Sequence, residues 1–172
     1  RREKPPALYD LTALQREANR ELGFTAQQTL DYLQALYEKQ LVTYPRTDSR
    51  YLTDSMAAKV PELVGVAAKL LDADAPASMN AAQVCDSSRV TDHHAVVLTP
   101  SAGRANLAAL PEGESAVLRL VCRQLLCAVS APFIYAETEV EAECGGYIFK
   151  AKGKSVIDLG WRAYTGAPEW TA

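Results

Sequence analysis

The sequence predicts an α+β protein that is mainly helical, with a small antiparallel sheet towards its C-terminal end. Apolar residues recur every three or four positions in several stretches between residues 12 and 132, which is the period of helices with one buried face. From Tyr135 the period changes to two, and acidic residues alternate with apolar or small ones up to Gly145-Gly146. This second pattern predicts a β-hairpin with one solvated, acidic face.

Two short helices are predicted in the first 40 residues. Thr12 and Thr25 each stand three residues before a glutamine, which is the spacing of a capping box at a helix start. Gly23 ends the first helix and separates it from the second. We expect the second helix to bury a stripe made of Ala26, Leu30, Leu33 and Tyr37.

A third helical region follows and is interrupted by a proline. A helix could start near Thr53 or Asp54, but Pro61 has no amide hydrogen, so we predict a break there and a new helix over residues 61–71. Asp72 and Asp74 come directly after it. Two carboxylates can hold a magnesium ion, but no third carboxylate is nearby, so we interpret them as a solvated loop.

The remaining elements alternate between irregular and regular. Residues 75–109 show little periodicity, and long connections in compact domains are usually functional or mobile. A broad apolar face predicts a central helix between Pro111 and Pro132. Residues 147–152 would form the partner strand of the hairpin, with lysines across from the glutamates, and residues 155–157 a third short strand.

Composition limits the class of protein. A net charge of −3 argues against binding of nucleic acid through bulk electrostatics, so any contact with DNA must be local. No apolar run approaches the roughly 20 residues of a membrane span. We therefore expect no membrane association and a cytoplasmic location.

The four cysteines form no close pair in the sequence, which predicts reduced thiols without a zinc or disulfide framework. They are Cys85, Cys122, Cys127 and Cys144.

A polar turn after the second helix is the main candidate for chemistry. Pro45 favours extended backbone at Tyr44, so the helix must end before it. Tyr44 and Arg46 are two positions apart, so in an extended chain their side chains would project to the same side. A phosphate approached by the phenol of Tyr44 could then be bound by the guanidinium of Arg46. The alternative is a surface turn in which Tyr44 packs on a helix and Arg46 pairs with Asp48.

Three motifs carry a family resemblance: residues 8–18 (LYDLTALQREA), 44–49 (YPRTDS) and 90–97 (VTDHHAVV). In this order and spacing they resemble the cleavage-rejoining region of type IA DNA topoisomerases, with a particular likeness to bacterial topoisomerase III. The resemblance implies that residues 10–132 are a helical cleavage-rejoining domain. It also implies that residues 1–9 are an extended segment leading in from a β-arch domain, whose strands resume over residues 133–172.

The family's chemistry implies roles for individual residues. Tyr44 would attack a phosphodiester of single-stranded DNA and hold the 5′ phosphate while a 3′ hydroxyl leaves; a phenolate, with a pKa of about 10, is a good enough leaving group for resealing without ATP. Arg46 would stabilise charge on the phosphate oxygens. His93 would shuttle a proton or contact the scissile phosphate.

Other residues would contact the DNA or orient the turn. The resemblance implies a DNA contact for His94, and Arg89 is a plausible phosphate contact that could equally be a solvated surface arginine. Thr47, Asp48 and Ser49 would orient the tyrosine turn next to the DNA, although Asp48 could simply make an Asx-type turn. Leu98 departs from the family, which usually has a proline before Thr99.

The resemblance also implies what lies outside this chain. The family binds Mg²⁺ in a separate toprim domain, and nothing in this sequence has a toprim pattern, so we predict no metal ligands here. The chain would then be a central fragment that is inactive without the toprim and gate domains. The alternative is a noncatalytic DNA-binding or interaction domain derived from the same fold.

Overall fold

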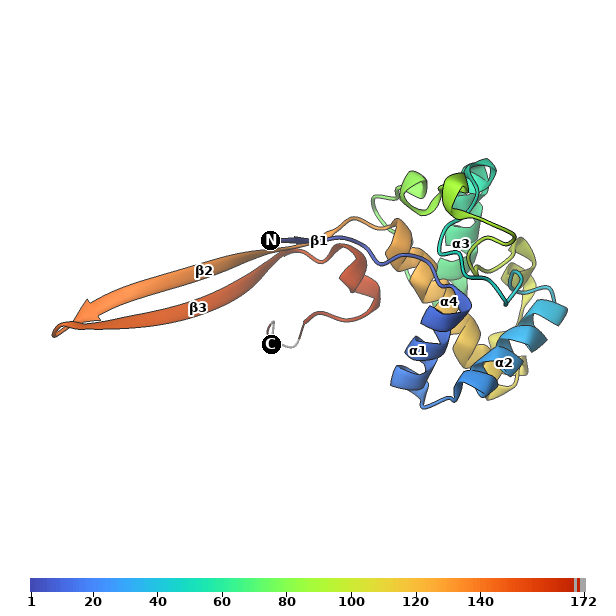
Figure 1. Cartoon of the computed structure of the whole chain (residues 1–172), viewed down its shortest axis with the longest axis horizontal. Helices are drawn as coiled ribbons and strands as arrows, with labels where there is room; N and C mark the ends of the chain where they lie inside the picture. Colours follow the sequence, from blue (N-terminus) through green and yellow to red (C-terminus); the bar gives the residue numbers. More distant parts are fainter. Residues whose placement is uncertain (169, 171–172) are drawn as a thin grey trace.

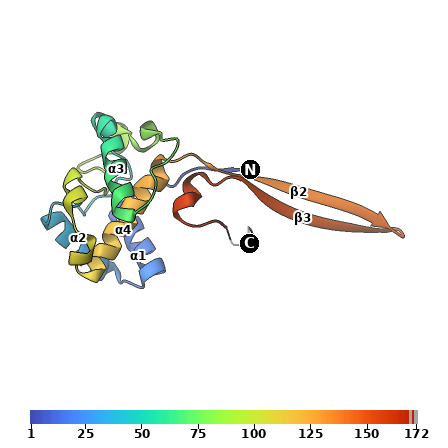
Figure 2. The ribbon, with the colours of Figure 1, turned by 180° about the vertical axis from the view of Figure 1, so that it is seen from behind.

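The computed structural model describes residues 1–168 and 170. Its helical body contains α1 (Leu11–Leu22), α2 (Ala26–Glu38), α3 (Val60–Leu71) and α4 (Glu112–Val129). A long antiparallel hairpin of β2 (Phe133–Cys144) and β3 (Tyr147–Asp158) projects from one side of this body, as both views show (Figures 1 and 2). The α+β class predicted from the sequence is therefore confirmed.

Helix α4 forms the centre of the body, where it contacts α1, α2 and α3 (Figure 1). Leu118, Leu125 and Leu126 on this helix are fully buried, as is Phe133 just after it. Removing one such side chain from water stabilises the fold by about 1.5–3 kcal/mol. The predicted central helix is thus confirmed, and it provides the rigid base on which the other helices pack.

The ends of the helices agree only in part with the sequence patterns. Asp10 caps α1 by accepting a hydrogen bond of 2.6 Å from the amide of Ala13, so the predicted capping box at Thr12 is wrong. The capping box at Thr25 is present in full. A short 3-10 helix (Asp54–Lys59) precedes α3, and Pro61 lies in the first turn of α3, which confirms the predicted break.

Helix α2 ends in a tight turn that positions the chain before Tyr44. Gln40 has a left-handed backbone (φ 60°), and the amide of Leu41 donates back to the carbonyl of Leu36 at 2.9 Å, as in a Schellman motif. Leu36 is fully buried, whereas 39% of Tyr37 is exposed. The predicted buried stripe is therefore wrong at both ends: Ala26 is exposed, and Leu36 takes the place expected for Tyr37.

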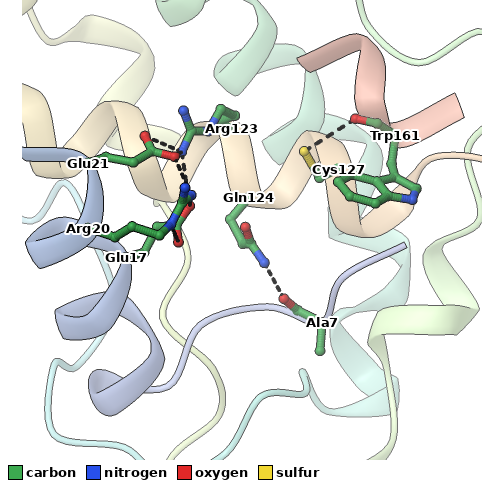
Figure 3. A network of polar contacts seen from close by, with 8 residues as sticks. All are labelled: Ala7, Glu17, Arg20, Glu21, Arg123, Gln124, Cys127 and Trp161. Carbon is green, nitrogen blue, oxygen red and sulfur yellow. Dashed lines mark hydrogen bonds and ion pairs between the residues drawn. The ribbon is translucent and has the colours of Figure 1, made fainter. Parts of the chain in front are cut away.

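A polar network joins α1, the N-terminal segment and the segment after the hairpin to α4 (Figure 3). Arg123 on α4 donates to both carboxylate oxygens of Glu21 at 2.8 and 2.7 Å, and Glu17 lies 3.5 Å away. The next residue on the helix, Gln124, donates to the carbonyl of Ala7. The Cys127 thiol lies 3.6 Å from the carbonyl of Trp161. These contacts fix residues that are distant in sequence around one helix.

The sheet has three antiparallel strands in the order β1-β2-β3, where β1 is the short strand Arg2–Glu3. The separate strand predicted for residues 155–157 is wrong, because these residues continue β3, and the third strand comes from the N-terminal segment. Glutamates of β2 face lysines of β3 as predicted, with ion pairs Glu139–Lys152 and Glu141–Lys150.

The structure also bears on the cysteines and on the possibility of a membrane-spanning helix. All four cysteines are free thiols in this structure. Within residues 1–168 and 170, no helix has the length and apolar character needed to cross a membrane.

Candidate active site

The chain around Tyr44 is held against the segment that follows the two histidines. Val42 and Leu98 form an antiparallel bridge, and the Thr43 amide donates to the carbonyl of Val97 at 2.9 Å. The hydroxyl of Thr43 accepts from the Val97 amide at 3.0 Å and donates to the carbonyl of Ala95 at 3.2 Å. The long irregular connection therefore returns to the tyrosine turn, and Leu98 is buried within that pairing.

Three rings lie in a row at this place. The centroid of the Tyr44 ring is 4.2 Å from that of His93, with 37° between the planes. The Tyr44 ring also makes an edge contact with the Tyr37 ring, with 5.6 Å between the centroids and 80° between the planes. All three rings line a surface depression of about 590 Å³. His93 is exposed, which favours a role at the surface over one in the core.

Two hydroxyl groups connect the tyrosine turn to the histidine segment. Thr47 donates to the carbonyl of His93 at 2.8 Å and accepts from the Ser49 amide at 3.1 Å. Ser49 donates to the carbonyl of Arg89 at 2.8 Å. Both residues are buried, so their hydroxyl groups hold the turn in place. Their predicted contact with DNA remains a prediction.

Arg46 and Asp48 do not pair with each other. In the part of the chain that the structure describes, Arg46 has no hydrogen-bond or ion-pair partner, and it is exposed. Asp48 accepts a long hydrogen bond of 3.4 Å from the hydroxyl of Thr91. The alternative of an Arg46–Asp48 ion pair is therefore not realised, and the guanidinium of Arg46 is available to an anion.

Arg89 and His94 lie on the same segment but make internal contacts. The guanidinium of Arg89 lies over the Tyr51 ring at 4.8 Å, donates to the Tyr51 hydroxyl at 2.7 Å and pairs with Asp86 at 3.1 Å. His94 Nδ1 is 2.8 Å from the carbonyl of Ala95, so the tautomer protonated there donates to it. Of the two histidines, only His93 contacts the Tyr44 ring.

The described residues do not fit a magnesium site. Over residues 1–168 and 170, no three His, Cys, Asp or Glu side chains come together as metal ligands would. Asp72 and Asp74 are both exposed, and the backbone carbonyl of Asp74 accepts from the Tyr164 hydroxyl at 2.9 Å.

Sequence reasoning missed two residues of the site, Tyr37 and Thr43. Tyr37 was assigned to the core by helical spacing, and the competing fit of Leu36 to the same stripe is the signal that could have placed it outside. Thr43 gave no signal, because its partners lie more than 50 residues away in the chain.

Comparisons with known proteins identify the family of this chain. A family profile described as DNA topoisomerase matches residues 1–172. DNA topoisomerase 3 of Bacillus licheniformis is 40% identical over 171 residues, and that of Bacillus subtilis 39% identical over 171 residues. Each alignment covers 92% of this chain and 22% of the relative. The chain thus spans under a quarter of the length of these curated relatives.

A solved structure supports the fold. Full-length topoisomerase I from Thermotoga maritima superimposes with a TM-score of 0.70 at 22% sequence identity, over 100% of this chain and 29% of that chain.

Proposed function

This chain belongs to the type IA DNA topoisomerase family, and on that premise we propose that it carries the cleavage-rejoining site of a longer enzyme. In the proposed reaction Tyr44 cuts one strand of single-stranded DNA and remains bonded to it while another strand passes through the break. The proposal rests on the contact between the Tyr44 ring and the exposed His93 ring, whose centroids are 4.2 Å apart. The turn that bears Tyr44 also bears Arg46, which has no ion-pair partner among the described residues.

The chemical step is a transesterification. The Tyr44 oxygen loses its proton and forms a bond to the phosphorus, and the bond from phosphorus to the 3′ oxygen breaks. The 3′ oxygen takes up a proton and leaves as a hydroxyl, and the phosphate stays on Tyr44 as a 5′-phosphotyrosine. Attack by the same 3′ hydroxyl reverses each change. One ester replaces another, so no ATP is required.

The neighbouring side chains have separate roles in this proposal. Arg46 stabilises the negative charge that develops on the phosphate oxygens, for which an unpaired guanidinium is suited. His93 accepts or donates the proton at the reacting oxygens. Thr47 and Ser49 position the turn through their internal hydrogen bonds, and Asp48, Arg89 and His94 border the DNA path.

The remaining parts of the active site would come from the rest of the enzyme. We place the family's Mg²⁺ in a toprim domain outside this chain, since the described residues do not fit the ion, and no step above depends on it. Residues 10–132 would be the cleavage-rejoining domain. The pairing of β1 with β2 supports the assignment of residues 1–9 and 133–172 to one β domain. We expect the enzyme to act in the bacterial cytoplasm.

The test uses a full-length protein that contains this chain. We expect the wild type to be trapped on single-stranded DNA as a denaturant-resistant adduct, and Tyr44→Phe to give none while it still binds the strand. A wild type that binds DNA without forming an adduct under any metal condition would instead favour the noncatalytic alternative.

A further inference from the structure

Tyr37 presents an aromatic ring to solvent next to the proposed nucleophile. It lies in the last turn of α2, where its neighbours Leu33 and Leu36 are fully buried, yet 39% of Tyr37 is exposed. Its ring centroid is 5.6 Å from that of Tyr44, in an edge contact. An exposed ring held this close to a reacting group is available to a substrate that approaches that group.

The depression beside Tyr37 is suited to a nucleobase more than to a phosphate. The described residues that line it include no lysine or arginine, and they are Tyr37, Glu38, Gln40, Val42, Thr43, Tyr44, His93 and Thr99. Beside Tyr37 a phosphate group would meet the carboxylate of Glu38, and Arg46, the guanidinium proposed for the scissile phosphate, is not among the lining residues. A base is uncharged and has a π-face, so aromatic walls favour it.

The position of Tyr37 is also fixed by the backbone. The turn after α2 returns two hydrogen bonds to the helix, from Gln40 to the carbonyl of Tyr37 at 2.8 Å and from Leu41 to that of Leu36 at 2.9 Å. The hydroxyl of Thr99 closes the turn by donating to the carbonyl of Gln40 at 2.5 Å. A ring placed on such a support loses little further freedom when a base stacks on it.

Building on the proposed function, we propose that Tyr37 is the stacking platform for a nucleobase next to the scissile phosphate of single-stranded DNA. A phosphate that meets the Tyr44 oxygen brings its own nucleotide to the depression, where the base reaches the Tyr37 ring. Stacking tolerates every base, so Tyr37 holds the strand in register without selecting one sequence.

The experiment measures binding without cleavage, in the full-length protein with Tyr44→Phe in all samples. We expect Tyr37→Leu to weaken binding of a single-stranded oligonucleotide roughly 5- to 100-fold, the range for loss of one stacked base. Tyr37→Phe should recover most of that affinity, because the ring and not the hydroxyl supplies the stacking. Tyr147→Leu is the matched control, since Tyr147 is 74% exposed near the hairpin tip, and it should bind as the parent does.

An abasic scan separates stacking from an indirect effect. Each nucleotide of the oligonucleotide is replaced in turn by an abasic residue. At one position the parent and Tyr37→Leu should bind equally weakly, because the base that Tyr37 contacts is gone. A loss in Tyr37→Leu that is the same at every position, or no loss at all, would overturn the inference. Equal melting temperatures confirm that both variants are folded.

The two proposals fail in different assays. The proposed function fails if the wild type forms no covalent adduct. The stacking inference fails if the abasic scan shows no position at which the parent and Tyr37→Leu bind equally weakly. This scan measures binding alone, so its result can be interpreted whatever the adduct assay gives.

Discussion

The hydroxyl group of Thr47 donates a hydrogen bond of 2.8 Å to the backbone carbonyl of His93, across 46 residues of sequence. This bond joins the turn that bears Tyr44 to the segment that bears His93, whose ring contacts the Tyr44 ring. Thr47 is only 8% exposed, so the bond is shielded from water. The distance between Tyr44 and His93 therefore depends on a side chain that need not touch DNA.

Replacing Thr47 with valine should damage both stability and rate. The change keeps the shape but leaves the His93 carbonyl and the Ser49 amide without their partner, which costs about 1–3 kcal/mol of unfolding free energy. Denaturant unfolding and single-turnover cleavage by the folded enzyme measure the two effects. Thr47→Ser keeps the hydroxyl and should retain both the stability and the cleavage rate. If Thr47→Val is as active and as stable as Thr47→Ser, the Thr47 hydroxyl does not hold the turn in place.

His93→Ala should slow cleavage or rejoining roughly 100-fold, as expected for loss of acid-base assistance. Its melting temperature should hardly change, because the His93 side chain is exposed and supports no part of the core. Single-turnover kinetics and thermal unfolding of the same variant give the answer. A drop in stability that accounts for the whole loss of activity would assign His93 a structural role.

His94→Ala is the internal control for that experiment. His94 is half-buried and bonded to the carbonyl of Ala95, and it does not contact the Tyr44 ring, so we expect a smaller kinetic effect than at His93. If His94→Ala slows the reaction more than His93→Ala does, the two histidines have been assigned in the wrong order.

The 172-residue chain on its own should fold but should not relax supercoiled DNA, with or without Mg²⁺. It has a buried core around α4, but its described residues do not form a magnesium site. A net charge of −3 should also make its binding to single strands weak. Circular dichroism and a gel-based relaxation assay test this, and relaxation by the isolated chain would show that the metal site is misplaced.

Acid should weaken the ion pairs that Glu17 on α1 makes with Arg20 on the same helix and with Arg123 on α4. The hydrogen bond from Arg20, with further help from Arg123, lowers the pKa of Glu17 from its ordinary 4.5, so the folded chain binds this proton less readily than the unfolded chain. The resulting stabilisation is present above about pH 4.5 and is lost as the pH falls through the lower pKa of the folded state.

Thermal unfolding measured from about pH 6 to about pH 3 should therefore show a fall that Glu17→Gln makes shallower. Glu62→Gln, at an exposed position in the first turn of α3, is the control outside this network. Identical slopes for Glu17→Gln and the parent would remove Glu17 from the acid response.

Local patterns in the sequence predicted local structure well. The cap at Thr25, the break at Pro61 and the Gly145-Gly146 turn each depend on residues a few positions apart, and all are present. The cap at Thr12 failed because Asp10 offers a competing carboxylate two residues earlier. The spacing of residues alone could not decide which of two nearby side chains, Asp10 or Thr12, caps the helix.

Contacts between distant segments were beyond these patterns. The third strand comes from residues 2–3, which pair with residues 133–134, and no period in the sequence connects them. Likewise the motifs identified Tyr44 and His93 as separate candidates, but the Thr43 and Thr47 hydrogen bonds that bring them together appear only in the folded chain. Tyr37 was misplaced because Leu36 competes for the same face of α2.

Whether Tyr44 is the nucleophile can be decided by identifying the residue that becomes linked to DNA. A full-length protein that contains this chain would be trapped on end-labelled single-stranded DNA, digested with a protease, and the DNA-bound peptide sequenced by mass spectrometry. We expect one modified peptide, which contains Tyr44 and is joined to the 5′ phosphate of the cut strand. Attachment through any other tyrosine, or to the 3′ end of the cut strand, would contradict it.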